Sequence, residues 1–423
     1  MLYAAFLLAR TCGWSRAAPP ALHALQERRL RALVAHAYAR VPVHRRRLEA
    51  AGLAPGAVRT LADLPRIPTM PKRLLREAPL EELVVRGFDP ARGDLVRTSG
   101  STGTPLRIVR GPREVDWHRA AGLRVLRELG FRWTDRTLEI RALAGPTLAV
   151  QRFRLAPKLW ASILDPPGAL LRTLLEYRPQ VLCATPSTLH ELAATALAEG
   201  VRPAPLRLVI SDAEPLVPTT RALVARAFGT DPTDVYGLVE LSNFAFECHE
   251  HRGLHLTADT HVVEVLDDDG RPAAPGAPGR VVVTDLIART MPMLRYETGD
   301  RAGLVTGRCP CGRTSPRLVE LVGRAADVVV LPDGRRLHWP YFHETLARFD
   351  DLERYQVIQD DPHRLRVRVL TRPERWGALT ARLRTELATQ LPASMTLALE
   401  PWGAEPEDPT RKYRPVLSRL DRA

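Results

Sequence analysis

Residues 97–105 read Arg-Thr-Ser-Gly-Ser-Thr-Gly-Thr-Pro, and this stretch is the sharpest local signal in the 423-residue chain. Its two glycines allow tight backbone turns, and hydroxyl side chains fill most of its other positions. Backbone N–H groups and hydroxyls in such a loop can surround phosphate oxygens. The loop lacks the Gly-Lys-Ser/Thr ending of a Walker loop. It therefore predicts a phosphate-binding loop of another class, with a polar surface turn as the alternative.

The pattern on either side of this loop predicts the fold class. Before it, apolar residues recur at helical spacing over 23–53, and the proline-rich turn 61–72 follows. From about Asp94, short β-branched runs alternate with helices, as in the strand 180–184 followed by the helix 187–200. Strand–helix alternation of this kind predicts a layered α/β architecture.

Two further regions complete the predicted organisation. Residues 255–331 are mostly strands, whereas the last hundred residues combine a hairpin over 355–370 with a helix over 376–391. We therefore expect a large multilayered N-terminal α/β domain with a strand-rich part, covering 1–323. A small, mobile α+β domain over 324–423 completes the chain.

Charge and composition narrow the function classes. The net charge is +13, but the basic residues are scattered and no stretch alternates aromatic with basic side chains, so a nucleic-acid partner is not expected. Lysine occurs only at Lys72, Lys158 and Lys412 among 61 basic residues. Arginine does not replace a compact ammonium, so the retained lysines are candidates for specific roles.

The chain is expected to be cytoplasmic. No apolar run reaches the roughly 18 residues of a membrane-spanning helix. The opening MLYAAFLLAR lacks a basic leader and a cleavage site, so it predicts a docked helix, with a membrane-surface role as the alternative. Five cysteines do not form a disulfide framework, which favours a reducing compartment.

Further motifs follow the loop in a fixed order. They are Ser-Asp-Ala-Glu-Pro at 211–215, Tyr-Gly-Leu-Val-Glu at 236–240, Arg-Tyr-Glu-Thr-Gly-Asp at 295–300, Gly-Arg at 323–324 and Lys-Tyr-Arg-Pro at 412–415. The set resembles the adenylate-forming superfamily, which includes acyl-CoA synthetases, luciferases and peptide-synthetase adenylation domains. The resemblance covers residues 97–415. The modest length and the helical start ending at 61–72 are most similar to the phenylacetate–CoA ligase-like subgroup.

The resemblance implies a reaction and its reagents. ATP and Mg²⁺ would activate a carboxylic acid to acyl-AMP, and the acyl group would pass to coenzyme A. The resemblance suggests an aryl or arylacetic acid as the substrate. Two half-reactions with different partners imply a mobile C-terminal domain with a hinge near Asp327.

The resemblance also assigns roles residue by residue. Lys412, Glu240 and Thr102 would serve the chemical step, with Lys412 bridging the carboxylate and the α-phosphate and Glu240 holding Mg²⁺. The nucleotide would be held by Thr98, Ser99, Gly100, Ser101, Thr102, Gly103, Thr104, Ala213, Glu214, Pro215, Tyr236, Gly237, Asp300 and Arg324. Tyr236 would stack on adenine, and Asp300 would accept hydrogen bonds from the ribose.

Two positions depart from the pattern of the superfamily. The glycine expected in the adenine turn is Ala213 or Asp212 here, which adds a Cβ where backbone must approach closely. Leu106-Arg107 stands where many relatives carry a lysine. Both departures leave room for altered activity.

A zinc site is predicted from cysteine and histidine spacing. Cys248 is followed by three histidines, His249, His251 and His255. Cys309 and Cys311 follow some fifty residues later. Three thiolates and one imidazole form a closed tetrahedral set, and some phenylacetate–CoA ligase-like proteins carry such a site. We expect Cys248, His255, Cys309 and Cys311 to bind structural Zn²⁺, with His249 or His251 as substitutes for His255 and free thiols as the alternative.

Three functions stay open from the sequence. The first is an acyl-CoA ligase, and the second is a free-standing adenylating enzyme that loads a carrier protein or another acceptor. The third is a non-catalytic relative in polysaccharide or natural-product assembly, which intact Lys412, Glu240 and Asp300 disfavour. A serine hydrolase is excluded because Ser187 is not in a nucleophile elbow. The oligomeric state, including a homodimer, is not determined by the sequence.

Overall fold

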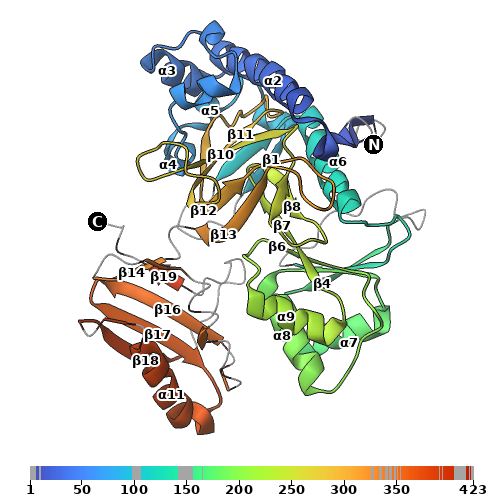
Figure 1. The fold of residues 1–423 in the computed structure, drawn as a ribbon, viewed down its shortest axis with the longest axis vertical. Helices are drawn as coiled ribbons and strands as arrows, with labels where there is room; N and C mark the ends of the chain where they lie inside the picture. Colours follow the sequence, from blue (N-terminus) through green and yellow to red (C-terminus); the bar gives the residue numbers. More distant parts are fainter. Residues whose placement is uncertain are drawn as a thin grey trace. The chain divides into compact units, whose positions relative to one another are not determined.

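A computed structural model provides the structure of the chain (Figure 1). The residues that it describes are 6–8, 11–97, 106–141, 156–163, 165–324, 328–332, 336–338, 342, 345–346, 349, 351–352, 354–389, 391–392, 394–403, 416–418 and 420. The chain separates into two compact units, 1–216 with 223–321 (unit 1) and 217–222 with 322–423 (unit 2). Strand β13 (Arg317–Arg324) crosses the boundary that the sequence predicts after residue 323. The division into functional domains 1–323 and 324–423 therefore remains a prediction.

One large mixed sheet organises unit 1. Among the described residues, its order is β10-β11-β12-β13-β9-β8-β7-β6-β5-β3-β4. Strands β4, β3, β5, β6 and β7 pair with one another in parallel. The pairs β7–β8, β8–β9, β9–β13, β12–β11 and β11–β10 are antiparallel. The strand bounds are β3 (Thr137–Arg141), β4 (Lys158–Ser162), β5 (Val181–Ala184), β6 (Leu208–Asp212), β7 (Pro232–Leu238), β8 (Ser242–Glu247), β9 (Leu254–Leu256), β10 (His261–Leu266), β11 (Gly279–Asp285) and β12 (Tyr296–Val305).

Helices cover both faces of the parallel part of this sheet. Helices α7 (Pro167–Tyr177), α8 (Pro186–Ala198) and α9 (Pro218–Phe228) bury apolar residues against β3 and β5, while α6 (Pro112–Glu128) packs against the other face. All four side chains of β5 are buried, as a strand covered on both sides requires. The strand–helix alternation predicted from the sequence is therefore confirmed.

The N-terminal helices pack over the antiparallel part. They are α2 (Pro19–Arg40), α3 (Pro42–Ala50), α4 (Lys72–Glu77) and α5 (Leu80–Leu83). Leu30 and Leu33 of α2 share a core with Val262 of β10 and with Leu286 and Leu294. A short antiparallel hairpin follows, made of β1 (Asp94–Arg97) and β2 (Arg107–Arg110). The predicted phosphate loop joins these two strands, and residues 98–105 lie outside the described residues.

Unit 2 is a small α+β unit, as the sequence predicts. Strands β16 (Arg354–Asp361) and β17 (Arg364–Leu370) form the expected hairpin, and β18 (Thr396–Pro401) and β19 (Val416–Ser418) flank it in the order β18-β17-β16-β19. Helix α11 (Trp376–Ala388) buries Leu379, Leu383 and Leu387, which recur at helical spacing. A second hairpin pairs β14 (Val328–Val330) with β15 (Arg336–His338).

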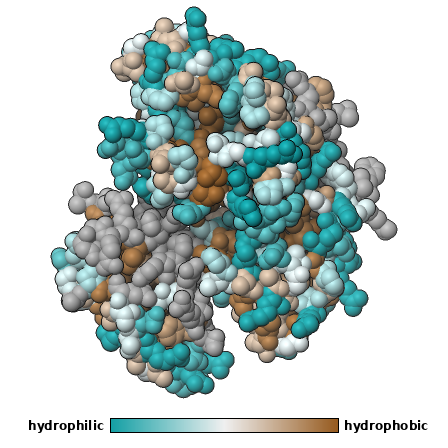
Figure 2. Space-filling model, in the orientation of Figure 1, coloured by the Kyte–Doolittle hydropathy of each residue, from teal (hydrophilic) through white to brown (hydrophobic). Residues whose placement is uncertain are grey.

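The visible surface is largely hydrophilic. Figure 2 shows polar and charged side chains over most of the described surface, with apolar patches between them. Among the described residues, no helix combines the length and the apolar character that crossing a membrane requires.

Arg295 joins the N-terminal segment to the sheet of unit 1. Its guanidinium is buried and pairs with Glu264 of β10 through Nε at 3.0 Å and Nη2 at 2.9 Å. Nη1 donates to the carbonyl of Ile67 at 2.6 Å and to that of Pro65 at 3.2 Å. The carbonyl of Arg295 in turn accepts from the backbone N–H of Met70 at 2.7 Å. One side chain therefore connects β10, the start of β12 and the segment before α4.

Replacing Arg295 by methionine should destabilise unit 1. The substitution leaves Glu264 largely buried without its partner and removes the donor to two carbonyls, so we expect the free energy of unfolding to fall by about 3–5 kcal/mol. Urea unfolding followed by circular dichroism measures the change. Arg301→Met in β12 is the control, because Arg301 pairs with the exposed Asp268 and such pairs contribute less than about 1 kcal/mol. Equal losses in the two variants would contradict the role of Arg295.

Candidate active site

The carboxyl ends of the parallel strands place the first group of predicted site residues. Strand β6 ends at Asp212, and Ala213, Glu214 and Pro215 form the turn that follows it. Ligands of open α/β sheets bind at these strand ends. Glu214 accepts a hydrogen bond from the backbone N–H of Ser187 at 3.1 Å, so the turn is attached to the start of α8.

Ala213 has a left-handed backbone conformation. Its φ is 68°, a value that favours glycine because the Cβ of an L-residue crowds the following carbonyl. The glycine expected at this turn from the resemblance thus has a physical reason in the geometry. The chain keeps the same conformation with alanine, at a cost of about 1–2 kcal/mol.

Two tyrosine–carboxylate hydrogen bonds connect the 236–240 and 295–300 motifs. The hydroxyl of Tyr236 donates to Oδ2 of Asp300 at 2.6 Å, and the hydroxyl of Tyr296 donates to Oε1 of Glu240 at 2.7 Å. All four side chains are buried. Each motif therefore supplies the tyrosine that binds the acid of the other motif. We call this pair of bonds the tyrosine–acid brace.

Glu240 is held as a buried carboxylate by Lys72. The Nζ of Lys72, at the start of α4, lies 3.0 Å from Oε1 of Glu240. Burial alone would raise the pKa of Glu240, but attraction to Lys72 and the hydrogen bonds from Tyr296 and Lys72 outweigh it and lower that pKa. An ionised, oxygen-rich group of this kind suits a hard divalent cation. The sequence did not assign Lys72 to this site, although its being one of three lysines was the available signal.

Tyr236 and Gly237 have clear packing roles. The ring of Tyr236 meets that of Phe244 edge-on, with centroids 4.8 Å apart, and burial followed by the nearby Asp300 raises the pKa of Tyr236 well above its usual range. A Cβ at position 237 would lie 2.7 Å from the carbonyl of Ser242 and 2.4 Å from the side chain of Asn243. Glycine is therefore required where β7 approaches β8.

Several predicted site residues lie outside this geometry. The loop residues Thr98, Ser99, Gly100, Ser101, Thr102, Gly103 and Thr104, together with Lys412, lie outside the described residues. Arg324 ends strand β13, and the structure describes its backbone only. Leu106, which with Arg107 forms the second departure from the pattern of the superfamily, is buried in the core of unit 1.

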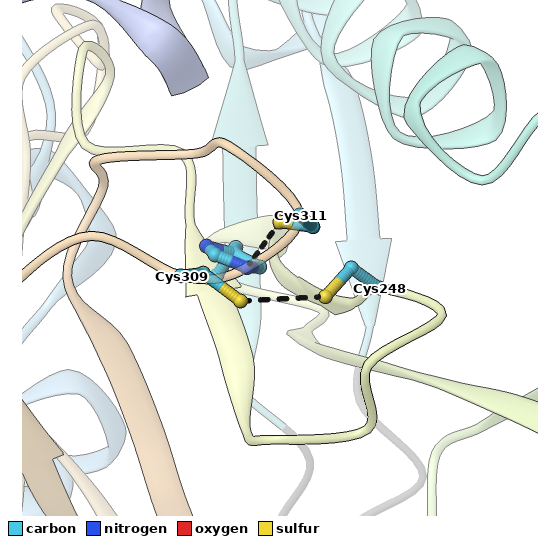
Figure 3. A group of neighbouring side chains, drawn as sticks. Cys248, Cys309 and Cys311 are labelled. Atoms are coloured by element: carbon cyan, nitrogen blue, oxygen red, sulfur yellow. Dashed lines mark hydrogen bonds between the residues drawn. The ribbon is translucent and has the colours of Figure 1, made fainter.

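The four predicted metal ligands come together. One ligand atom from each of Cys248, His255, Cys309 and Cys311 lies within 4.8 Å of the other three. The Cys248 and Cys309 sulfurs are 3.9 Å apart, and the Cys311 sulfur is 3.4 Å from Nε2 of His255 (Figure 3). Tetrahedral zinc with its usual bond lengths separates two sulfurs by about 3.8 Å and a sulfur from a nitrogen by about 3.6 Å. The spacing of the donors thus fits a zinc ion.

The surroundings of this cysteine–histidine cluster also fit a metal site. His255, in β9, has its other ring nitrogen, Nδ1, 3.2 Å from the Ser315 hydroxyl, an outer contact of the kind that orients a ligand. Burial lowers the pKa of His255 to about 4, with Arg313 adding to the effect, so the imidazole is neutral. The two alternative histidines have carboxylate neighbours instead. Nε2 of His249 lies 3.3 Å from Oε1 of Glu250, and Nδ1 of His251 lies 3.0 Å from Oε2 of Glu247.

Comparisons with known proteins agree with this geometry. The family described as AMP-binding enzyme matches residues 138–287. The chain is 34% identical over 324 residues to a phenylacetate–coenzyme A ligase of Thermus thermophilus, covering 73% of this chain and 72% of the relative. It is 28% identical over 350 residues to the phenylacetate–coenzyme A ligase of Escherichia coli, covering 80% and 79%.

Solved structures support the fold independently. A 2-hydroxyisobutyryl-CoA ligase in the postadenylation state superimposes with a TM-score of 0.76 at 22% identity, covering 94% of this chain and 89% of that one. An anthranilate CoA ligase gives a TM-score of 0.57 at 17% identity, covering 76% and 65%. The extent of the match to the Thermus relative, together with the AMP-binding match, shows that this chain belongs to the phenylacetate–coenzyme A ligase family of adenylate-forming enzymes.

Proposed function

We propose that the chain is an ATP-dependent acid–thiol ligase that converts a carboxylic acid to acyl-AMP and then to a coenzyme A thioester. The observation that carries the proposal is the 34% identity to a phenylacetate–coenzyme A ligase over most of both chains. In the first step a carboxylate oxygen attacks the α-phosphorus of ATP and pyrophosphate leaves. In the second step the thiol attacks the acyl carbonyl and AMP leaves.

The described residues suit the nucleotide part of this reaction. The hairpin of β1 and β2 would present Thr98 to Thr104 to the β- and γ-phosphates. Glu240 would hold Mg²⁺, which would neutralise charge on the phosphates, and it is already ionised beside Lys72. Asp300, which Tyr236 orients, would accept hydrogen bonds from the ribose hydroxyls. The turn at Ala213, Glu214 and Pro215 would contact adenine, with Tyr236 and Gly237 opposite it and Arg324 near the ribose.

Two anions must meet in the first step, so a cation is needed at the carboxylate and α-phosphate. We propose that Lys412 supplies it, carried by unit 2 on a hinge near Asp327. Closure of unit 2 would then differ between the two half-reactions, as their different partners require.

We propose the acid by its chemical class only, and we name two candidate acceptors for the acyl group. The named relatives support an aryl or arylacetic acid and coenzyme A. A carrier protein stays the second candidate acceptor, because acyl-AMP formation is common to both functions. A homodimer is a further hypothesis, which a measurement of the molecular mass in solution would test.

An exchange assay tests the proposed function. The purified chain with Mg²⁺ should catalyse acid-dependent exchange of pyrophosphate into ATP, with phenylacetate and benzoate among the acids of the panel. Coenzyme A, and not a carrier protein, should then give a stable thioester. Glu240→Gln should lower the exchange rate by about 10²-fold, because the carboxylate that holds Mg²⁺ is lost. No exchange with any acid of a broad panel would favour the non-catalytic relative instead.

Lys412→Ala separates the two half-reactions. Loss of one transition-state donor should slow acyl-AMP formation by about 10²-fold or more. Thioester formation from supplied acyl-AMP should be nearly unchanged, because Lys412 acts only in the first step. Lys158→Ala is a lysine control, since Lys158 pairs with Glu139 at the far end of the sheet. Equal slowing of both half-reactions by Lys412→Ala would refute the assignment.

We also propose that the cysteine–histidine cluster binds structural zinc. Four protein ligands would close the coordination sphere and leave no position for substrate. The ion would join the end of β8, strand β9 and the turn at 309–311, which are distant in sequence.

Metal analysis tests this site. The purified chain should contain about one equivalent of zinc, and Cys309→Ser should lose it and lower the melting temperature, because zinc affinity contributes to folding. Cys12→Ser is the matched control, since Cys12 is outside the cluster and contacts the Leu8 carbonyl. Unchanged zinc content in Cys309→Ser would disprove the ligand set.

A further inference from the structure

A cavity of about 630 Å³ opens in unit 1 at the N-terminal end of α6. Its lining comes from α2, from the start of α6 and from the 286–290 segment that follows β11. Strand β2 separates it from the phosphate loop, because the loop joins β2 before Arg107 and the cavity begins at Gly111, after Arg110. Four strand residues span about 13 Å. The cavity is thus at the opposite end of the hairpin from the predicted phosphate loop.

The walls of this cavity are preformed. The carboxylate of Glu114 accepts from the backbone N–H groups of Gly111 and Thr290, each at 2.6 Å, and from that of Arg289. The carbonyl of Thr290 accepts from the N–H of Val85 at 2.9 Å. A Cβ at Gly111 would lie 2.7 Å from the Thr290 hydroxyl, so the two backbones approach closely. Ligand sites are usually preformed in this way.

The cavity is cationic. Arg29, Arg113 and Arg289 line it together with one acid, Glu114, whose carboxylate three N–H groups already engage. Outside the lining, Asp259 pairs with Arg29 and Asp285 lies near Arg289, so Arg113 and Arg289 carry the positive character of the cavity. Nη1 of Arg289 is buried and has no hydrogen-bond partner within the described part of the chain. An unsatisfied buried donor is costly, and a bound anion would offset that cost.

The rest of the lining is apolar and partly aromatic. Phe88, Trp117, Leu286 and Ile287 contribute to it, and the guanidinium of Arg29 lies over the Trp117 ring at 5.5 Å. Arginine forks match phosphate oxygens in bidentate geometry, and aromatic walls suit a flat apolar body. The residues therefore select an anion that carries an apolar group.

We propose that this cavity binds a small organic phosphate with its phosphate against Arg113 and Arg289 and its apolar body against Phe88 and Trp117. The proposed site is distinct from the phosphate loop and does not depend on the proposed ligase function.

Equilibrium binding of naphthyl phosphate to the full chain tests the proposal, with naphthamide as the neutral probe and with excess ATP and Mg²⁺ present. The phosphate should bind in the presence of ATP, and naphthamide should bind at least about tenfold more weakly. Arg113→Gln and Arg289→Gln should each weaken binding by about tenfold or more, as loss of a charge-assisted hydrogen bond does. Arg113 is exposed, so its substitution leaves folding intact even if Arg289→Gln does not fold.

Arg119→Gln is the matched control, because Arg119 is an exposed arginine of the same helix that pairs with Asp116 outside the cavity. Its affinity for naphthyl phosphate should equal that of the unaltered chain. The proposal is overturned by no binding, by equal affinity in Arg113→Gln, or by displacement of the probe by ATP, which would place it in the nucleotide site.

Discussion

The tyrosine–acid brace is the constraint on which the candidate active site depends. Tyr236 and Glu240 belong to one motif, Tyr296 and Asp300 to another, and each hydroxyl binds the carboxylate of the other motif. Buried carboxylates are costly unless hydrogen-bonded, so the two motifs stabilise each other only in this mutual arrangement. The acids that would meet Mg²⁺ and ribose are therefore oriented before any ligand arrives.

The N-terminal region completes this arrangement from outside the sheet. Lys72 pairs with Glu240, and Arg295, the residue before Tyr296, binds carbonyls of the segment that leads to α4. The same short segment thus supplies a charge to the site and is attached to the strand that carries the brace. This explains why the helical N-terminal region belongs to unit 1.

Besides the tyrosine–acid brace, unit 1 contains two other groups of residues that are arranged in advance for a proposed ligand. The cysteine–histidine cluster joins three segments near β9, where β13 pairs with His255 through Arg317. The cavity at the start of α6 is held by Glu114, whose carboxylate satisfies three backbone donors. Both are local solutions to the same problem, because loops between strands must satisfy their backbone or side-chain polar groups before they can hold a fixed shape.

The sequence by itself determined the fold class, the hairpin and helix of unit 2, the order of the motifs and the three cysteines of the cysteine–histidine cluster. These follow from local periodicity and from residue types at short spacing, which physical chemistry constrains directly. It named His255 with two alternatives, and it assigned no partner to Lys72 or Arg295. Only the tertiary structure decided that His255 faces the thiols, which tyrosine binds which acid, and that Lys72 neutralises Glu240. The two tyrosine–acid bonds join residues 64 and 56 positions apart, and Lys72 is still further from Glu240 in the sequence. Their partners are selected by strand order and packing, which no local pattern encodes.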